Sequence, residues 1–233
     1  MELINEKLSW DTTDLGVYPK TSIIKKWSYE KSKYIIIETD DGLICGSYQK
    51  YTTGLPLIIE QLREVFGLHK IGIHLITIGT IKYILYRTSI SGTYVLLNMN
   101  IKSYPLIDQI SSTIKKLFLF NELLNLSDAT ESNIVINGTK IYNINDQKLV
   151  DNSLLGYNSC VLNRNVIGRW FLRQSFDVTL QEMLFGGSRP SDNKTEQELM
   201  RIRQQIEDII VEYDPNYMWY AKSIMEKVVR YLF

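Results

Sequence analysis

The stretch LLNLSDATESNIVINGTKIYNIND, residues 123–146, combines the features that decide between the fold classes open to this 233-residue chain. Its centre holds Asn137–Gly138, a dipeptide typical of two-residue β-hairpin turns, between the β-prone segments IVI and KIY. The residues before it continue a helical pattern that begins at about Pro105. Asp128 and Asn133 lie in the polar segment between that helix and the hairpin. The stretch therefore predicts a helix, a polar loop and a hairpin, in that order.

The residues before this stretch predict an antiparallel sheet that contains one helix. Segments rich in β-branched and aromatic residues alternate with polar or glycine-containing breaks at 22–51 and again at 71–99. Between them, Pro56 occupies a position that a first helical turn accepts, and apolar residues then recur at helical spacing. We expect this helix at about 55–66. The N-terminal part of the chain, residues 1–102, is therefore expected to be a β-rich lobe.

The C-terminal part, residues 103–233, has the pattern of a mainly helical lobe with a β-hairpin at about 133–145. Two helical patterns follow at 195–213 and 216–233, with Pro215 between them. No period of 20–50 residues recurs, so a solenoid is excluded. The expected fold class is α+β with two lobes.

Charge and hydropathy exclude several classes of function. The chain has 26 Lys+Arg and 26 Asp+Glu, so its formal net charge is zero. Proteins that bind nucleic acid or an anionic membrane mainly by bulk charge need a surplus of basic residues. The most apolar stretch, residues 71–86, contains His74 and Lys82 and is shorter than the ~20 residues of a spanning helix. We expect no nucleic-acid partner and no membrane partner.

Cysteine usage and the first residues favour the cytoplasm. Cys45 and Cys160 form no CxxC pair and cannot supply a disulfide framework. The opening MELINEKLSW lacks the basic segment and apolar core of a secretion signal. Frequent Ile, Asn, Lys and Tyr, with Ala129 and Ala221 as the only alanines, are typical of an AT-rich genome such as that of a large DNA virus or a protist parasite. We expect a cytoplasmic protein, located in the host cytoplasm or the virion if it is viral.

The stretch at 123–146 resembles the catalytic-loop and metal-loop segment of the lipid-kinase-like superfamily, which includes the phosphoinositide 3- and 4-kinases. In that family an apolar run precedes Asp-Arg-His, two further residues, Asn, a β-hairpin and a hydrophobic-Asp-Phe-Gly segment. The resemblance implies a kinase-like fold. It places Asp128 at the catalytic aspartate and Asn133 at the magnesium-binding asparagine. It also places Asn145, followed by Asp146, at the metal-binding aspartate.

Phosphoryl transfer explains why these residue types matter. Mg²⁺ neutralises charge between phosphates, so the reaction needs hard oxygen ligands close to a carboxylate that aligns the nucleophile. The resemblance therefore implies ATP and Mg²⁺ as cofactors. Ala129–Thr130 replace Arg-His, however, and Asn145 offers a neutral carbonyl where an aspartate offers a full charge. We expect this site to bind Mg²⁺–nucleotide weakly.

A shift of the alignment by one residue gives a different metal site. Asp146 then restores the carboxylate that Asn145 lacks. Side chains alternate between the two faces along a strand, so the shift also moves the ligand to the other face of the hairpin. Both alignments stay open at this point.

The resemblance also implies a lysine on the third strand of the N-terminal lobe and a helix carboxylate that holds it. Lys50, at the end of GLICGSYQK, is the candidate lysine for nucleotide binding, with Lys33 and Lys82 as alternatives. Glu60 and Glu64, on the expected helix, are the candidate partners. No glycine-rich phosphate loop of the GxGxxG type is present.

Each candidate also has an ordinary structural role. Asp128 can form a turn, Asn133 can bond to its own backbone, and Lys50 can be a surface lysine. His69 and His74 have no nucleophile at a recognisable spacing, so a catalytic triad is not predicted.

The C-terminal helices carry an apolar stripe and an aromatic cluster. The stripe consists of Leu199, Ile202, Ile206, Ile209 and Ile210, and the cluster of Tyr213, Tyr217, Trp219 and Tyr220. Core packing explains the stripe, while Tyr and Trp are also enriched at interface anchors. These helices are therefore the expected surface for a protein partner.

Three functions compete. The first is a pseudokinase with weak or absent phosphotransfer, which acts as a nucleotide-binding or protein-interaction module. The second is an active atypical kinase in which Asp128 orients the acceptor, Asn133 and Asp146 hold Mg²⁺, and Lys50 contacts the phosphates. The third is a structural or adaptor protein without nucleotide binding. Amides at the metal positions favour the first, so we do not expect an efficient enzyme.

Overall fold

The structure is a computed structural model of the 233-residue chain. It describes the backbone of residues 9–11, 17–18, 21–29, 32–39, 42–78, 80–87, 95–96, 107–126, 134–137, 140–143, 176–187 and 190–233. The side chains that it describes are those of Ile35 and of residues 46–77, 80–86, 112–126, 176–187 and 190–233.

The chain divides into two compact units. The first consists of Met1–Leu57 and Ile71–Ser91, and the second of Ile58–Lys70 and Gly92–Phe233. The boundary expected between residues 102 and 103 lies outside the described residues and stays a prediction. Strands form most of the first unit and helices most of the second, so the α+β class is confirmed.

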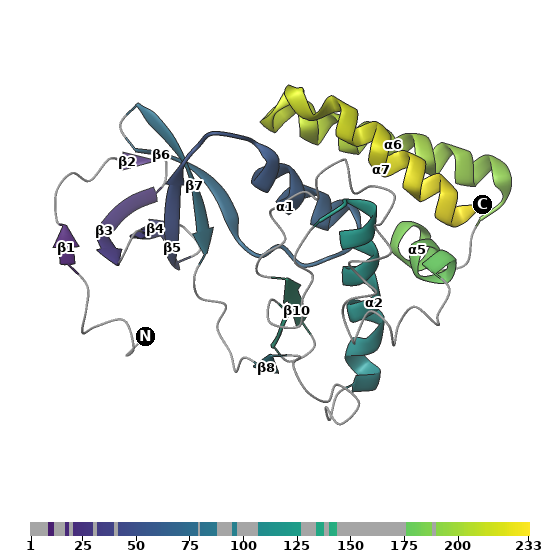
Figure 1. Cartoon of the computed structure of the whole chain (residues 1–233), viewed down its shortest axis with the longest axis horizontal. Helices are drawn as coiled ribbons and strands as arrows, with labels where there is room; N and C mark the ends of the chain where they lie inside the picture. Colours follow the sequence, from purple (N-terminus) through teal and green to yellow (C-terminus); the bar gives the residue numbers. More distant parts are fainter. Residues whose placement is uncertain are drawn as a thin grey trace. The chain divides into compact units, whose positions relative to one another are not determined.

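The first unit is built on an antiparallel sheet of seven strands (Figure 1). Its strands are β1 (Ser9–Asp11), β2 (Val17–Tyr18), β3 (Thr21–Tyr29), β4 (Ser32–Thr39), β5 (Gly42–Lys50), β6 (Ile73–Ile78) and β7 (Ile81–Arg87). They lie in the order β1-β3-β4-β5-β7-β6, and β2 pairs with β3. The strands β3, β4 and β5 form the meander that the turns in the sequence predict, and β7 pairs with both β5 and β6.

A small core lies on this sheet. Ile35, Ile76 and Leu85 are buried together, with Tyr48 and Tyr83 packed against them. The two tyrosine rings meet edge to face, with centroids 5.4 Å apart, an arrangement that aromatic pairs prefer. These residues come from β4, β5, β6 and β7, so the core depends on the pairing of four strands.

Gly46 allows β5 and β7 to approach closely. A Cβ atom at this position would lie 2.5 Å from the Tyr86 carbonyl oxygen and 2.7 Å from Leu85 Cδ1. Gly46→Ala is therefore expected to destabilise the first unit by about 2–3 kcal/mol, because the backbone carbonyl has little room to move. Hydrogen exchange of the β5 and β7 amides measures this effect as faster exchange.

Gly187→Ala is the matched control for this substitution. A Cβ at Gly187 meets no atom within 4 Å, so the change is expected to alter stability by less than about 0.5 kcal/mol. Equal exchange in the two variants would show that Gly46 is not a packing requirement.

The second unit contains five described helices and a three-stranded sheet. Its helices are α1 (Leu55–Val65, of which residues from Ile58 on belong here), α2 (Ile107–Leu123), α5 (Phe176–Phe185), α6 (Asp192–Tyr213) and α7 (Met218–Leu232). Its strands, in the order β10-β9-β8, are β8 (Val95–Leu96), β9 (Ile134–Asn137) and β10 (Lys140–Asn143). A short 3-10 helix, η5 (Pro215–Tyr217), connects α6 to α7.

The helix α2 is at the centre of the second unit and contacts α5, α7 and β10. Its buried residues include Leu117, Phe118, Phe120 and Leu123. Phe120 meets Phe66, just after α1, edge to face at a centroid distance of 5.8 Å. The ring that follows α1 thus packs against the buried face of α2.

The ends of α1 and α2 have the same backbone geometry. Gly67 has φ 68° and Asn125 has φ 52°, the left-handed conformation that favours glycine and is tolerated by asparagine. In both, the following residue bonds back to the helix: Leu68 N donates to Arg63 O at 2.7 Å, and Leu126 N donates to Asn121 O at 2.9 Å. These are Schellman-type ends, which satisfy carbonyls that a helix leaves without partners.

The helices α6 and α7 form a helical hairpin whose inner face is buried. Ile202, Ile206 and Ile210 of α6 are buried, as are Ile224 and Val228 of α7. The predicted apolar stripe therefore belongs mainly to the core. No helix within the described part of the chain is long and apolar enough to cross a membrane.

Candidate functional site

Four of the predicted site residues lie outside the described residues: Asp128, Asn133, Asn145 and Asp146. Their roles stay predictions. The structure does describe the elements on either side of them in the sequence. The chain is described up to Leu126, two residues before Asp128, and again from Ile134, the first residue of β9.

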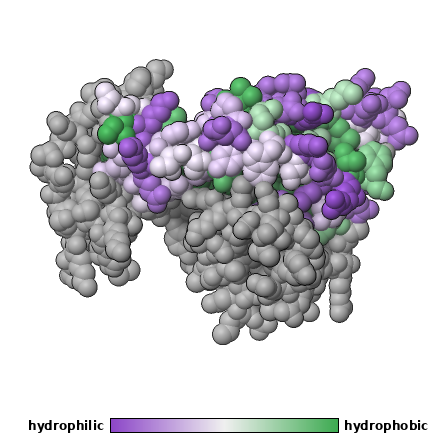
Figure 2. Space-filling view, turned by 45° about the horizontal axis from the view of Figure 1, so that its top comes forward, coloured by the Kyte–Doolittle hydropathy of each residue, from purple (hydrophilic) through white to green (hydrophobic). Residues whose placement is uncertain are grey.

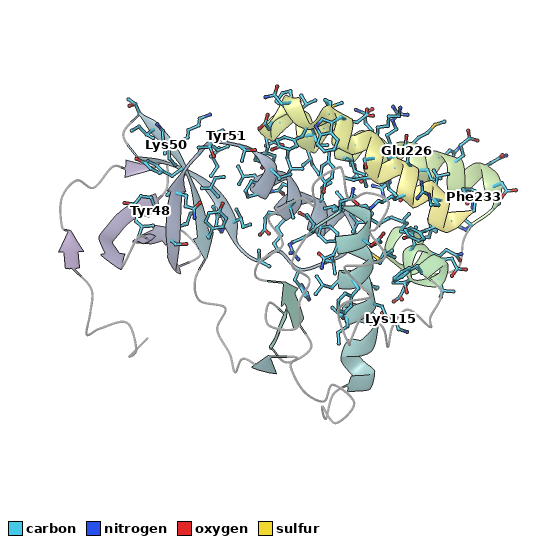
Figure 3. The ribbon with its side chains drawn as sticks, viewed as in Figure 1. Tyr48, Lys50, Tyr51, Lys115, Glu226 and Phe233 are labelled. Carbon is cyan, nitrogen blue, oxygen red and sulfur yellow. The ribbon has the colours of Figure 1, made fainter. Side chains whose placement is uncertain are left out.

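Lys50 is described, and it is the last residue of β5. Its backbone pairs with Tyr83 of β7, and its side chain is exposed (Figure 3). Lys82, the alternative lysine on β7, is exposed as well, and the side chain of Lys33 is outside the described set. Lys50 belongs to the first unit, whereas Glu60 and Glu64 belong to the second.

Glu60 is buried and forms an ion pair within its own helix. Arg63 Nε lies 3.7 Å from Glu60 Oε2, and the side chains are 0% and 2% exposed, respectively. The guanidinium carbon of Arg63 lies 5.4 Å from the centre of the Phe120 ring, within cation–π range. Burial lowers the pKa of Arg63 to about 10, while the Glu60 charge acts in the opposite direction. Arg63 therefore stays charged at neutral pH.

Glu64 has a different environment on the same helix. It is exposed and pairs with Lys70, whose Nζ lies 2.6 Å from Glu64 Oε2. The hydrogen bond and the charge of Lys70 lower the pKa of the Glu64 carboxyl. Lys70 also donates to Gln61 Oε1 at 2.8 Å. Because water surrounds this pair, it adds little to stability.

The last turn of α2, which leads toward Asp128 in the sequence, is held by α7. Lys227 Nζ donates to the Glu122 carbonyl oxygen and to Asn125 Oδ1, and the Tyr220 hydroxyl donates to the Leu124 carbonyl oxygen. Lys227 and Tyr220 are both buried. We call Glu122, Asn125, Tyr220, Lys227 and Tyr231 the α2–α7 polar cluster.

Charge in the α2–α7 polar cluster is partly compensated. Lys227 Nζ lies 4.0 Å from Glu122 Oε1, and the Tyr231 hydroxyl donates to the same oxygen at 3.3 Å. Burial lowers the pKa of Lys227, and the Glu122 charge opposes this shift. Burial raises the pKa of Tyr220 well above its usual value, and burial together with Glu122 raises the pKa of Tyr231 to about 12. Both tyrosines therefore stay neutral at physiological pH.

The cluster holds the backbone at the end of α2. Two of its hydrogen bonds end on backbone carbonyls of the last turn of α2, which an isolated helix would leave to water. Within the described part of the chain, no group of three or more His, Cys, Asp or Glu residues could hold a metal ion. The cluster thus fixes the path of the chain just before the predicted catalytic loop.

The sequence contains a signal for this cluster, although Tyr220 alone of its residues has a predicted role, as part of the aromatic cluster of the C-terminal helices. The buried residues of α7 include Tyr220, Ala221, Ile224 and Val228, and Lys227 falls on the same stripe. A lysine on the buried stripe of an amphipathic helix is unusual, because its ammonium needs partners. Asn125, directly after a helical pattern, is likewise a common helix terminator. Spacing alone could not have paired residues that are 102 positions apart.

A scan against protein-family models finds no match, and a comparison with curated proteins finds none either. Similar solved structures do exist, at low sequence identity. The Helicobacter pylori proinflammatory kinase CtkA is 10% identical at a TM-score of 0.44, covering 85% of this chain and 89% of CtkA. The Shewanella oneidensis HipA–HipB toxin–antitoxin complex with its operator DNA gives 13% identity and a TM-score of 0.40, covering 95% of this chain and 66% of the matched one.

Another similar structure is the Neurospora crassa complex of PAN2 with the pseudokinase and C-terminal regions of PAN3. It is 12% identical at a TM-score of 0.33, covering 97% of this chain and 61% of the matched one. This chain thus spans somewhat less than two thirds of the matched chains in the HipA–HipB and PAN2–PAN3 structures. Kinases and a pseudokinase are among the similar structures, at values too low to assign this chain to any of their families.

Proposed function

We propose that this chain is a diverged kinase-like protein that binds nucleotide weakly, has little or no phosphotransfer activity, and acts as a nucleotide-binding or protein-interaction module. Its proposed relation is to the lipid-kinase-like superfamily. The observation that carries the proposal is the place of the β9–β10 hairpin in the chain. It follows Asp128 and Asn133 and precedes Asn145, so the predicted catalytic and metal segments flank it as the resemblance requires.

The order of the larger elements supports the same proposal. A β-rich unit interrupted by α1 precedes α2, the hairpin and the C-terminal helices. Polar residues between a buried helix and a hairpin are well placed for binding, since the elements that flank them are fixed by packing. The α2–α7 polar cluster supplies such fixation on the α2 side.

Weak phosphotransfer follows from the charge of the predicted metal ligands. Asn133 and Asn145 together carry no formal charge, whereas Mg²⁺ sites in phosphoryl transfer use carboxylates. The two candidate helix carboxylates also have cationic partners in their own unit, because Glu60 pairs with Arg63 and Glu64 with Lys70.

Thermal unfolding with and without nucleotide tests the proposal. If the dissociation constant for ATP is near 1 mM, 5 mM ATP should add about 1 kcal/mol, or ~2–4 °C in Tm. We expect this shift to change little when EDTA replaces Mg²⁺, and Asn145→Asp to make it larger and dependent on Mg²⁺. Asn193→Asp, at an exposed position in the first turn of α6 and outside the predicted ligand set, controls for the added charge.

Each of three experimental outcomes would contradict a part of this proposal. No shift at millimolar ATP would exclude nucleotide binding and favour the adaptor function. Weaker binding by Asn145→Asp would show that the alignment at the hairpin is wrong. Efficient Mg²⁺-dependent transfer of the γ-phosphate, lost in Asp128→Ala, would establish the active kinase instead.

A further inference from the structure

The side chain of Asn121, on α2, is a buried amide without a hydrogen bond in the described part of the chain. It is 3% exposed, and neither Nδ2 nor Oδ1 has a partner there. Figure 2 shows many hydrophilic side chains, in purple, at the surface on one face of the molecule, where water solvates them. Burial of an amide without partners is destabilising, and native proteins leave few such groups unsatisfied. The position of Asn121 on α2 indicates what pairs with it.

Three directions around α2 are taken by contacts of residues close to Asn121. Lys116 Nζ lies 3.0 Å from a carboxylate oxygen of α5. The Phe120 ring meets Phe66, and Glu122 accepts a hydrogen bond from α7. Successive residues of an α-helix lie about 100° apart around its axis. Asn121 therefore points about 100° away from both Phe120 and Glu122, and ~140° away from Lys116. It lies on a fourth side of α2.

Among the described elements, β10 is the one that remains for this fourth side. The helix α2 contacts α5, α7 and β10, and its contact with β10 is more extensive than that with β8 or β9. The strand β10 lies at the edge of its sheet, whose order is β10-β9-β8. Every second residue of an edge strand directs its backbone N–H and C=O groups away from the neighbouring strand. Polar groups are thus available on both sides of the contact between α2 and β10.

We propose that Asn121 is a positioning residue that joins α2 to the outer edge of β10 through a buried water molecule. The amide and two backbone groups of β10 supply the three hydrogen bonds that such a water typically makes. The strand β10 ends at Asn143, two residues before Asn145. The bridge therefore fixes the strand that leads to the predicted metal position. Its effect on nucleotide binding rests on the proposed function, whereas the bridge itself does not.

Hydrogen exchange of the full chain tests the bridge with two variants that change the amide in different ways. Asn121→Leu has no polar side-chain atom, and its larger side chain fills the volume of the amide together with that of the water. We expect a Tm close to that of wild type but exchange of the β10 amides that is about tenfold faster. Asn121→Ser keeps a hydrogen-bonding group and leaves a small cavity, so we expect a lower Tm but wild-type exchange in β10.

Asn193→Leu is the matched control, because it makes the same chemical change at an exposed position in the first turn of α6. It should leave both the Tm and the exchange of β10 unchanged. The same variants test the link to the predicted site. In thermal unfolding with ATP, we expect Asn121→Leu to lose about half or more of the wild-type shift in Tm, while Asn121→Ser and Asn193→Leu keep it.

Separate outcomes would overturn the bridge, its effect on the site, and the proposed function. Wild-type exchange of β10 in Asn121→Leu would show that the amide does not join α2 to this strand. Exchange as fast in Asn121→Ser as in Asn121→Leu would show that the side chain only fills volume. A full ATP shift in Asn121→Leu, despite faster exchange in β10, would disprove the effect on the site. A wild-type chain without any ATP shift would contradict the proposed function, and hydrogen exchange would still decide whether the bridge exists.

Discussion

Phe120→Ala is expected to destabilise the helical unit by about 4 kcal/mol, the largest effect that we predict for a single truncation. Phe120 is fully buried on α2, and its ring contacts Phe66 and the Arg63 guanidinium. Removal of a buried aromatic ring costs ~3–5 kcal/mol through lost burial and the cavity that remains. Urea unfolding followed by circular dichroism at the helix band measures the change.

The position of Arg63 increases the loss of stability that we expect from Phe120→Ala. Its cation is 0% exposed, and the Phe120 ring and the Glu60 carboxylate are two of the groups that surround it. A buried cation is tolerated only where partners compensate for lost hydration. Alanine at position 120 removes the aromatic face and leaves that charge less well compensated.

Phe120→Leu separates the contribution of buried volume from that of the contact between the aromatic ring and the Arg63 cation. Leucine restores most of the volume but has no ring quadrupole, so we expect a loss of about 1–2 kcal/mol. If Phe120→Ala costs less than ~2 kcal/mol, the packing between the end of α1 and α2 is looser than the contacts indicate.

Lys227→Met is expected to destabilise the same unit by about 3 kcal/mol, which lowers Tm by ~6–12 °C. Methionine fills a similar volume but donates no hydrogen bond. The Glu122 carbonyl and Asn125 Oδ1 both accept from Lys227, so both lose this donor at a buried site. The Glu122 carbonyl keeps the Asn125 N–H as a donor at 3.3 Å, so the loss is that of two hydrogen bonds from a charged donor, each of which contributes about 1.5–3 kcal/mol. Differential scanning calorimetry measures the shift.

Lys222→Met, on the same helix, is the control for this prediction. The Lys222 side chain is 82% exposed, and its pair with Glu226 is 3.9 Å long, so we expect a change below about 0.5 kcal/mol. Tyr220→Phe, which removes one hydrogen bond to the Leu124 carbonyl, should fall between the two at ~1–2 kcal/mol. Equal effects of Lys222→Met and Lys227→Met would mean that the polar cluster does not hold the end of α2.

Lys227→Met also tests whether α7 influences the predicted site. Faster hydrogen exchange at the last turn of α2 in Lys227→Met would show that α7 restrains the segment that precedes Asp128. The nucleotide-induced shift in Tm should then decrease in the same variant, although Lys227 is not among the predicted ligands.

Local signals determined much of the fold. The β9–β10 hairpin follows from Asn137–Gly138 between two β-prone segments, and α1 follows from Pro56 and an apolar stripe that runs to Phe66. In each case the deciding residues lie within a few positions of one another, and their backbone preferences favour one local conformation. The same logic identified the meander β3–β4–β5.

The sequence predicts the candidate site only as a set of residue types, and this stays a prediction. The sequence marks Asp128, Asn133 and Asn145 by their order around the hairpin, but it contains no information on where Glu60 finds its counter-charge. The structure supplies Arg63 for Glu60 and Lys70 for Glu64. Charge pairing depends on side-chain direction and burial, which a linear pattern of charges does not specify.

The sequence by itself determined the element types, the hairpin and the balance of charge, because these depend on neighbouring residues or on composition alone. Only the tertiary structure decided that β8 pairs with β9, that most of α1 belongs to the helical unit, and that Lys227 holds the end of α2. Lys227 and Asn125 are 102 residues apart. Contacts over such separations form only when several elements bury their apolar faces together, so no local preference could have revealed them.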